Sequence, residues 1–429
     1  MSLLQELAVW QTSFFVITCV GFLAGLLGGC LMPQKKILSS EVFSHVSYPA
    51  AILASIPYVL LRDYVSYEFL LICIVFPSFY LSQYLLDFLS KLFVSTDVAM
   101  TWLIGVTMGV GIYLVSILQF SMIPNISQQA NMFLFGDVLS VLSDELYYLL
   151  GVSLLFSVFV VTCRRWLMVY CMDESYANQL FINSIVFKRI YTVVTSMAMI
   201  MCIKSCGVLM ITAFVTSSAV ISNQGATRFI SFVFLSGFLG ASFGLLGMFG
   251  HVFLDKLYQI RIPPGILAVF LISTCALIIL LIHPRTGWLI TSYRRIVYYI
   301  RCEGENILKS FIRSGNVNFN KWYLDHYYEY DNGRFYGYIT HVWLLYCNYI
   351  RYNKSGDVEL TQSGENRGND ILRKHRLWEL YLTTEIGAEK KDVHYNAEQV
   401  EHILKQENVD ELNRRLNHPT KDPHDQDIP

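Results

Sequence analysis

Long apolar runs separated by short polar segments fill the first two-thirds of the chain. Runs long enough to cross about 30 Å of hydrocarbon as helices lie at residues 11–32, 38–60, 67–90, 97–118, 145–163, 229–250 and 264–283. The stretch 188–223 is too long for one crossing, and Ser205-Cys206-Gly207 divides it into two. The pattern predicts nine transmembrane helices, which place the two ends of the chain on opposite sides of a membrane.

The loops between these runs differ in their content of Lys and Arg. With the N-terminus outside, nine of these residues face the cytoplasm and four face outward. Cytoplasmic loops carry an excess of Lys and Arg, so we expect the C-terminal part to be cytoplasmic. Residues 130–144 are apolar but too short to span, and we expect a half-helix or a surface segment that shapes an outer vestibule.

Charge density rises sharply behind the last apolar run. Residues 1–284 contain 12 Lys/Arg and 12 Asp/Glu, whereas residues 285–429 contain 20 and 21. We therefore expect an all-α polytopic membrane domain at 1–284, a linker at 285–303 and a small α/β soluble region behind it. The near-balance of charge in both parts is not typical of a strongly basic nucleic-acid surface or of an acidic tail.

The soluble part contains helical and strand-like patterns. Residues 293–308 permit a helix, and residues 356–364 show alternation with flanking glycines, as in a strand of a β-hairpin. Leucines at helical spacing among charged residues predict another helix over residues 370–386.

One carboxylate and one imidazole lie in the second apolar run. Glu41 and His45 are four residues apart, so both project from one face of a helix and can share a cation. Ionisable groups in hydrocarbon usually face a pathway, and this donor pair suits Mn²⁺, Fe²⁺ or Zn²⁺. An ion pair at the cytoplasmic mouth of the span explains the same residues, and composition leaves both open. Cys202 and Cys206 have the same spacing, but their apolar neighbours favour simple packing.

A second group of candidate ligands lies near the end of the soluble part. It comprises His375, Glu379, His394, Glu398, Glu401 and His402. A solvated charged helix could supply one His–Glu pair. Three histidines interleaved with glutamates match the ligands of divalent metals better, and the sequence therefore predicts a metal site here.

A phosphate-binding loop of the form Gly-x-x-x-x-Gly-Lys-Ser/Thr is absent from the sequence. The segment from Gly304 to Ser310 comes near this pattern but lacks the second glycine. A nucleophile–base set does not stand out either. We therefore expect no enzyme activity and no nucleotide site on this chain.

Several stretches resemble, in order along the chain, the metal-ion permeases of the ABC-3 family. They are residues 21–29, 39–49, 131–141, 207–213 and 262–265. The resemblance implies a type II importer permease in a bacterial inner membrane, with Glu41 and His45 in the metal path. Asp173, Glu174 and Ala177 resemble the cytoplasmic element that contacts the ATPase subunit. The implied partners are this ATPase, an extracytoplasmic metal-binding lipoprotein and a second permease chain, identical or different.

The C-terminal residues resemble metal-dependent repressors of the diphtheria-toxin-repressor class. The resemblance lies in residues 373–380, 393–402 and 416–429. It implies a degenerate winged-helix region at 304–369 and a metal-binding and dimerisation region at 370–429, and we expect no third, SH3-like domain. One metal site of the class matches His375, Glu379 and His394, and the other matches Glu398, Glu401 and His402. Glutamate at 398, where iron sensors have cysteine, favours manganese.

The DNA-reading half of this resemblance is poorly matched. A recognition helix would cover about residues 333–343, where Arg334, Thr340 and His341 are the polar side chains available to contact operator DNA. The ligand that the class takes from its first helix falls near Asn306, which is a weak donor.

Together these features predict the membrane permease subunit of an ATP-binding-cassette importer for a divalent transition metal. Manganese or iron is favoured and zinc is a third option as the bound ion. The cytoplasmic C-terminal domain is expected to be a metal-responsive, repressor-like regulator. The alternative is a secondary transporter or channel whose C-terminal domain only gates transport, which would need neither an ATPase nor a binding protein.

Overall fold

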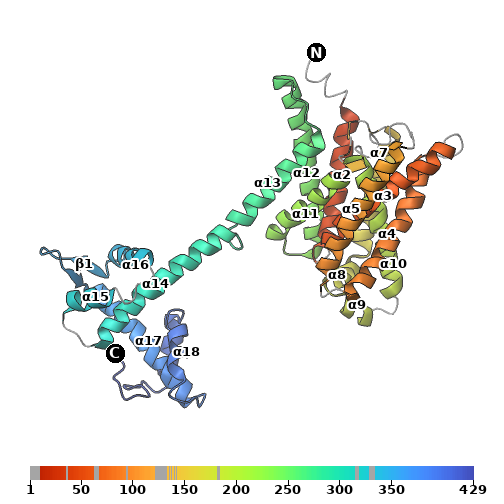
Figure 1. Cartoon of the computed structure of the whole chain (residues 1–429). Coiled ribbons are helices and arrows are strands. Elements are labelled where there is room, and N and C mark those ends of the chain that lie inside the picture. The colour runs from red at the N-terminus through yellow and green to blue at the C-terminus, as the bar shows by residue number, and fades with distance from the viewer. Residues whose placement is uncertain are drawn as a thin grey trace. The chain divides into compact units, whose positions relative to one another are not determined.

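The computed structural model describes most of the chain. The described residues are 10–34, 37–61, 67–92, 95–120, 143–180, 184–314, 318–327 and 334–429, together with 133–134, 136, 138–139 and 141. The chain divides into two compact units, Met1–Gly287 and Trp288–Pro429 (Figure 1). The membrane part predicted at 1–284 falls within the first unit.

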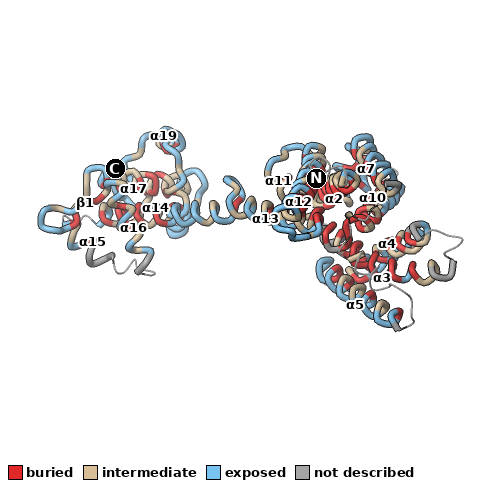
Figure 2. Tube along the Cα trace, turned by 90° about the horizontal axis from the view of Figure 1, so that it is seen from above, coloured by how far each residue is buried: buried red, intermediate tan, exposed pale blue. Residues whose placement is uncertain are grey.

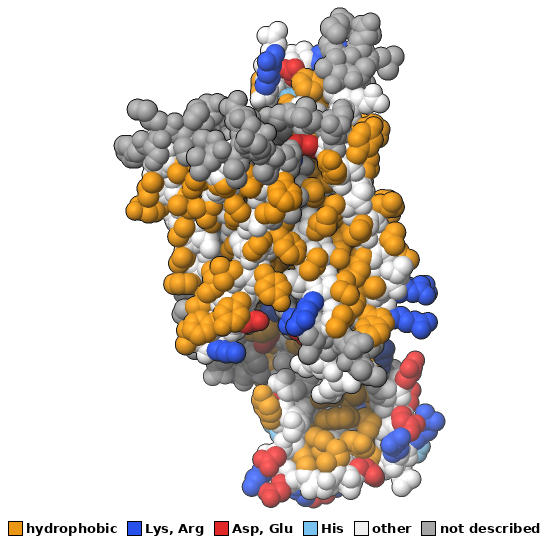
Figure 3. Space-filling view, turned by 90° about the vertical axis from the view of Figure 1, so that its right-hand side faces the viewer, with side chains coloured by type: hydrophobic (Ala, Val, Ile, Leu, Met, Phe, Trp, Pro, Cys, Tyr) orange, Lys and Arg blue, Asp and Glu red, His pale blue; other side chains and the backbone are white. Residues whose placement is uncertain are grey.

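The first unit is a bundle of helices. They are α2 (Gln11–Leu31), α3 (Ile37–Leu61), α4 (Tyr67–Leu92), α5 (Thr96–Phe120), α7 (Ser143–Thr162), α8 (Arg164–Met172), α9 (Glu174–Leu180), α10 (Ser184–Cys206), α11 (Val208–Gly225), α12 (Phe229–Tyr258) and α13 (Pro264–Ile282). Within the described residues, seven of these helices have the length and apolar composition of membrane spans. Hydrophobic side chains cover the face of the bundle shown in Figure 3. The chain is therefore a multi-pass membrane protein.

Helix α2 lies in the interior of this bundle (Figure 2), and 72% of its 18-residue apolar stretch is buried. Its glycines allow backbone contact with the neighbouring helices. A Cβ atom on Gly25 would lie 2.2 Å from the carbonyl oxygen of Ser236 in α12, and one on Gly28 would lie 2.1 Å from that of Val215 in α11. Lipid is as apolar as leucine, so membrane helices associate largely through such close packing of small residues.

The predicted break in the long apolar stretch lies at Gly207, between α10 and α11. The φ angle of Gly207 is 81°, in the left-handed region that favours glycine. Gly136 packs onto the break, because a Cβ atom on it would lie 2.2 Å from the carbonyl carbon of Cys206. Much of the segment 130–144 lies outside the described residues, but the described Val138 is buried. The count of nine crossings stays a prediction.

The second unit combines helices with one short hairpin. Its elements are α14 (Trp288–Ser314), α15 (Phe319–Tyr327), α16 (Arg334–Tyr346), β1 (Ile350–Tyr352), β2 (Val358–Leu360), α17 (Gln362–Thr384), α18 (Val393–Val400) and α19 (Gln406–Arg415). The two strands pair antiparallel, with Arg351 opposite Glu359. Helix α14 runs without interruption from the predicted linker into the region behind it.

Helix α17 begins at Gln362 and not at the predicted residue 370. Thr361 is the reason, because its hydroxyl oxygen accepts a hydrogen bond from the backbone N–H of Gly364 at 3.1 Å. Such a cap satisfies one of the unpaired N–H groups at a helix start. The extra turns in front of residue 370 carry Arg367 towards the centre of the unit.

The glycine contacts of α2 give a first prediction. Gly25→Ala places a methyl group against the backbone of α12, and overpacking of this kind costs about 1–3 kcal/mol. We expect a lower melting temperature in detergent, measured by fluorescence-detected size-exclusion chromatography after heating. Gly105→Ala on α5 is the matched control, since its Cβ would meet no atom within 4 Å. Equal melting temperatures for the two variants would contradict the packing argument.

Candidate metal centre

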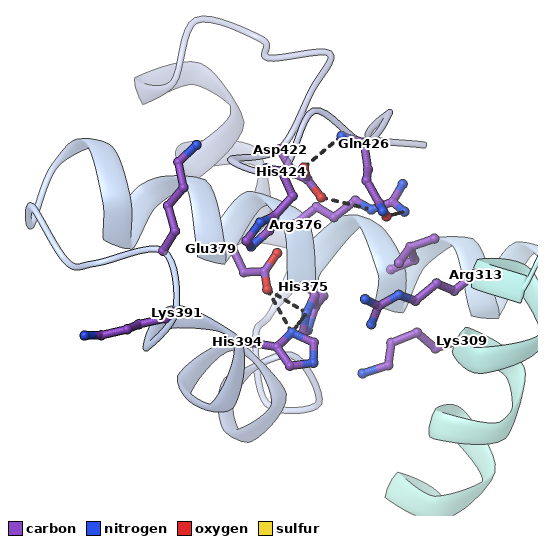
Figure 4. A pocket seen from close by; sticks show the side chains of 12 residues that line it. Lys309, Arg313, His375, Arg376, Glu379, Lys391, His394, Asp422, His424 and Gln426 are labelled. Carbon is purple, nitrogen blue, oxygen red and sulfur yellow. Dashed lines mark hydrogen bonds and ion pairs between the residues drawn. The ribbon is translucent and has the colours of Figure 1, made fainter.

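Three side chains from two helices of the second unit converge on one point. His375 and Glu379 lie one turn apart on α17, and His394 lies in the first turn of α18 (Figure 4). Glu379 Oε1 lies 3.1 Å from His375 Nε2 and 2.9 Å from His394 Nδ1. The two imidazole nitrogens are 3.0 Å apart. Among the described residues, this is the one cluster of three or more ligating side chains whose donor atoms all lie within 4.8 Å of each other.

Burial and hydrogen bonding shift the pKa of two members of this centre. His375 and Glu379 are buried, and His394 is partly exposed. Burial alone would raise the pKa of Glu379, but hydrogen bonds from His375 and His394 lower it to about 2. Burial would also lower the pKa of His375, and its bonds to Glu379 and Glu401 outweigh this and raise it. Two imidazoles and one ionised carboxylate are a donor set that fits a divalent transition metal.

The C-terminal tail covers the same centre and was missed in the sequence. A cavity of about 400 Å³ beside the three ligands is also lined by Asp422, His424 and Gln426. Arg376 of α17 holds the tail through the carbonyl oxygen of Asp427 and through Gln426 Oε1, the latter at 2.9 Å. Figure 4 shows the ring of His424 beside Glu379. The Asp-Pro-His run at residues 422–424 was the pattern that could have revealed these donors.

The second predicted ligand set is only partly brought together in this structure, with Glu401 Oε1 3.4 Å from His402 Nε2. Glu401 is fully buried, with Oε2 2.5 Å from His375 Nδ1 and Oε1 accepting a hydrogen bond from Lys309 Nζ at 2.6 Å. Glu398 is half exposed and lies 3.5 Å from His394 Nε2. Glu398 and His402 nevertheless line one cavity of about 390 Å³. The ammonium of Lys309 therefore takes a carboxylate oxygen that the resemblance assigns to a metal.

Glu305 in α14 is another buried acid that sequence reasoning missed. It accepts hydrogen bonds from Arg301 at 2.9 Å and from Arg367 at 2.5 Å, and its Oε2 lies 2.7 Å from His402 Nδ1. Burial alone would raise the pKa of Glu305, but the bonds to His402, Arg367 and Arg301 lower it to about 2. His402 Nε2 lies 3.1 Å from Asn306 Oδ1, so both ring nitrogens of His402 have partners.

The candidate transport residues lie on α3. Glu41 is partly exposed and His45 is buried. In the described part of the chain, Nδ1 of His45 has no hydrogen-bond partner. Neighbouring buried hydroxyls are satisfied by backbone, since Ser44 donates to the carbonyl of Ser40 at 2.9 Å. Buried polar atoms without partners are rare, and in the tautomer protonated at Nε2 this nitrogen carries a lone pair that a cation could bind.

The candidate ATPase contact lies on the short helices behind α7. Asp173 Oδ1 accepts a hydrogen bond from the backbone N–H of Tyr176 at 3.0 Å, which caps the start of α9. Glu174 pairs with Lys188 at 2.6 Å, and Ala177 is buried. The cap and the ion pair hold α9 against the bundle and leave Tyr176 exposed.

The candidate DNA-reading residues lie on α16. Thr340 is 3% exposed. His341 Nδ1 lies 2.8 Å from the hydroxyl of Tyr323, and its Nε2 lies 2.7 Å from that of Tyr352. Neither residue presents a free polar atom in this geometry. The side chain of Arg334 lies outside the described residues. Residues 315–360 hold four Lys/Arg against five Asp/Glu, which is not the basic balance typical of DNA-binding domains.

Comparison with protein families agrees with the two-part architecture. A model described as "ABC 3 transport family" matches residues 6–283. The chain belongs to this family. A second model, "Iron dependent repressor, metal binding and dimerisation domain", matches residues 361–429. This ABC 3 family member therefore carries a repressor-type metal-binding domain behind its permease domain.

Individual relatives match one or both parts. A "Probable metal transport system membrane protein" of Chlamydia trachomatis serovar D is 24% identical over 444 residues, covering 98% of this chain and 96% of the relative. The "Iron-dependent repressor IdeR" of Mycobacterium bovis is 36% identical over 72 residues, covering 17% of this chain and 31% of the relative. The structure "PsaBC from Streptococcus pneumoniae in complex with Fab" has a TM-score of 0.55 at 19% identity, covering 67% of this chain and 97% of that one. At this identity the likeness supports the fold alone.

The three-ligand centre gives a second prediction. Mn²⁺ at a hundred times its Kd should stabilise the second unit by about 2.7 kcal/mol, seen as slower amide hydrogen exchange in α17 and α18 of the full chain. Glu379→Gln removes the shared carboxylate and should abolish this protection. Glu389→Gln is the matched control, because Glu389 is exposed and pairs with Lys391. Equal Mn²⁺ protection in both variants would exclude Glu379 as a ligand.

The buried ammonium gives a third prediction. Lys309→Met leaves Glu401 without its lysine partner, and loss of one member of a buried ion pair costs about 3–5 kcal/mol. We expect faster hydrogen exchange throughout α14 and α17 in metal-free protein. Lys391→Met removes an exposed lysine and should leave exchange unchanged. If Lys309→Met also behaves like wild type, the ion pair does not hold the unit together.

Proposed function

We propose that this ABC 3 permease imports a divalent transition metal, with manganese or iron favoured over zinc, and that its C-terminal domain responds to the same ion. The observation that carries the proposal is the His375–Glu379–His394 centre on the same chain as a permease bundle. An importer raises the metal concentration in the cytoplasm. A sensor on the same chain would therefore respond to the concentration that the importer produces.

The transport path runs past α3 in this proposal. Glu41 and His45 supply a carboxylate and an imidazole one helical turn apart. Nδ1 of His45 has no partner among the residues that the structure describes, which supports a role as a ligand. Both donors suit Mn²⁺, Fe²⁺ or Zn²⁺. Because both donors lie on one helix, a passing ion could replace some of its water ligands with the carboxylate and the imidazole. The ion would not have to be enclosed by protein ligands on all sides.

The proposed topology has nine crossings, an outer N-terminus and a cytoplasmic C-terminal unit. Helices α3 and α11 supplement the seven spans, and the bias of Lys and Arg supports the orientation. The capped helix α9 then lies on the cytoplasmic side, where Tyr176 and its neighbours can meet an ATPase subunit. An extracytoplasmic lipoprotein delivers the metal, and a second permease chain completes the channel.

In the proposed sensor, metal binds the first ligand set. Its effect is transmitted to the second set through His375, which contacts both Glu379 and Glu401. The shared ring links metal binding to the packing of α14 against α17 and α18, since Glu401 also bonds Lys309 of α14. We propose that metal occupancy of this network gates transport when the ion is plentiful.

Uptake into proteoliposomes tests the transport proposal. With the ATPase and binding protein present, ⁵⁴Mn uptake should require ATP and fall to near background in Glu41→Gln and His45→Ala. Asp97→Asn, at the exposed start of α5, should keep wild-type uptake. Uptake by the chain alone under an ion gradient, without ATP, would instead support the secondary transporter or channel.

Operator DNA is a second candidate partner, favoured by the order α15, α16 and a two-stranded hairpin. If α16 enters a major groove, Arg334→Ala should weaken binding by about 1–3 kcal/mol. Fluorescence anisotropy with Mn²⁺-loaded full chain and promoter DNA measures this, with Lys390→Ala on the exposed loop before α18 as the control. If the full chain does not bind promoter DNA even at low salt, gating of transport is the remaining role for the domain.

A further inference from the structure

The first three turns of α14 expose a large apolar surface. Residues 288–299 contain no buried side chain, although eight of the twelve are apolar or aromatic. Trp288 and Tyr293 are each 66% exposed, Leu289 is 47% exposed and Ile296 is 45% exposed. Burial begins at Ile300, where α14 enters the core of the second unit. Contiguous apolar patches on a protein surface mark contacts with a partner or a membrane.

Three of the exposed apolar residues form a stripe, whereas the exposed Tyr298 lies on the side of Thr291. Leu289, Tyr293 and Ile296 are spaced by four and three, so they share a face of the helix. Thr291 and Arg295 lie on the other side. A stripe of this kind, with cations away from it, is typical of helices that lie in the interfacial layer of a bilayer.

The charge and position of the segment indicate what covers the stripe. Asp and Glu are absent from residues 256–302 of the sequence, while Arg285, Arg294 and Arg295 lie within or just before these turns. The last apolar helix, α13, ends at Ile282, only five residues before α14 begins. Arginines beside a membrane are attracted to anionic lipid headgroups, and Trp and Tyr concentrate at this layer. A second copy packed on this stripe would cover its apolar residues but would leave Arg294 and Arg295 with no Asp or Glu in residues 256–302 to pair with.

We propose that residues 288–299 lie flat in the headgroup layer of the membrane face from which the second unit emerges. Leu289, Tyr293 and Ile296 face the acyl chains, and Arg294 and Arg295 contact anionic headgroups. The inference goes beyond the proposed function, since it holds whatever metal is carried. It makes the start of α14 a membrane-bound anchor for the sensor.

Site-specific photocrosslinking in the full chain tests this placement. Benzoylphenylalanine replaces Tyr293 in one variant and Thr291, on the opposite face, in the control. Each protein is reconstituted in nanodiscs of phosphatidylcholine with phosphatidylglycerol, or of phosphatidylcholine alone, and adducts are identified by mass spectrometry. We expect severalfold more lipid adduct at 293 than at 291, and a lower yield at 293 without phosphatidylglycerol or after Arg294→Gln with Arg295→Gln.

Three outcomes would overturn the proposal. Adducts at 293 mainly to a second copy of the chain would show that α14 pairs with itself. Equally low lipid yields at both positions would show a helix in water. A yield of lipid adduct at position 293 that changes neither with lipid charge nor with the arginine substitutions would show that anionic headgroups do not contribute to binding. ⁵⁴Mn uptake by the same nanodisc-grade protein in proteoliposomes separates failure of this placement from failure of the transport function.

Discussion

Removal of polar groups from water is the constraint on which both units depend. In the first unit, backbone groups inside a membrane have to bond to each other, so the chain forms helices, and glycines such as Gly25 bring those helices into backbone contact. In the second unit, the carboxylates of Glu305 and Glu401 leave water. Arginines and His402 surround the first, and Lys309 and His375 surround the second. These contacts join α14, α17 and the end of α18 into one network.

The same network sets the conditions for metal binding. His375 offers Nε2 to the centre that it shares with Glu379, while its Nδ1 contacts Glu401. A cation bound by the first set therefore changes the charge and hydrogen bonding of a ring that also belongs to the second. The ammonium group of Lys309 already pairs with the carboxylate of Glu401. A metal ion entering the second set therefore has to compete with this ammonium group for a carboxylate oxygen. If both sets bind metal, as we propose, binding at the two is coupled for this reason, and coupling between sites is reciprocal.

The sequence was sufficient where one pattern decided the outcome. Apolar length predicted the seven helices that have the composition of membrane spans, and Gly207 marked the break between α10 and α11. Residue type and spacing placed His375, Glu379 and His394 among six candidate ligands, and the family resemblance grouped these three, whose donor atoms the structure brings together. What the sequence did not show were contacts between distant segments, such as Lys309 with Glu401, ninety-two residues apart. The start of α17 was misplaced because a single threonine cap outweighed the leucine pattern. His424 escaped notice because a tail residue gains a role only when Arg376 holds the tail over α17.

The unbroken helix α14 also has a consequence for how the sensor could be separated from the permease. Its 27 residues span about 40 Å at 1.5 Å per residue. Proteases nick exposed, irregular chain far more readily than ordered helix. A cut within α14 would first require its turns to unwind, and beyond Ile300 those turns are buried with Glu305 and Lys309 in the ionic core. The short turn at residues 283–287 is the more accessible place for an endoprotease, and cleavage there would leave a C-terminal fragment that keeps all of α14, including the residues that we propose bind the membrane.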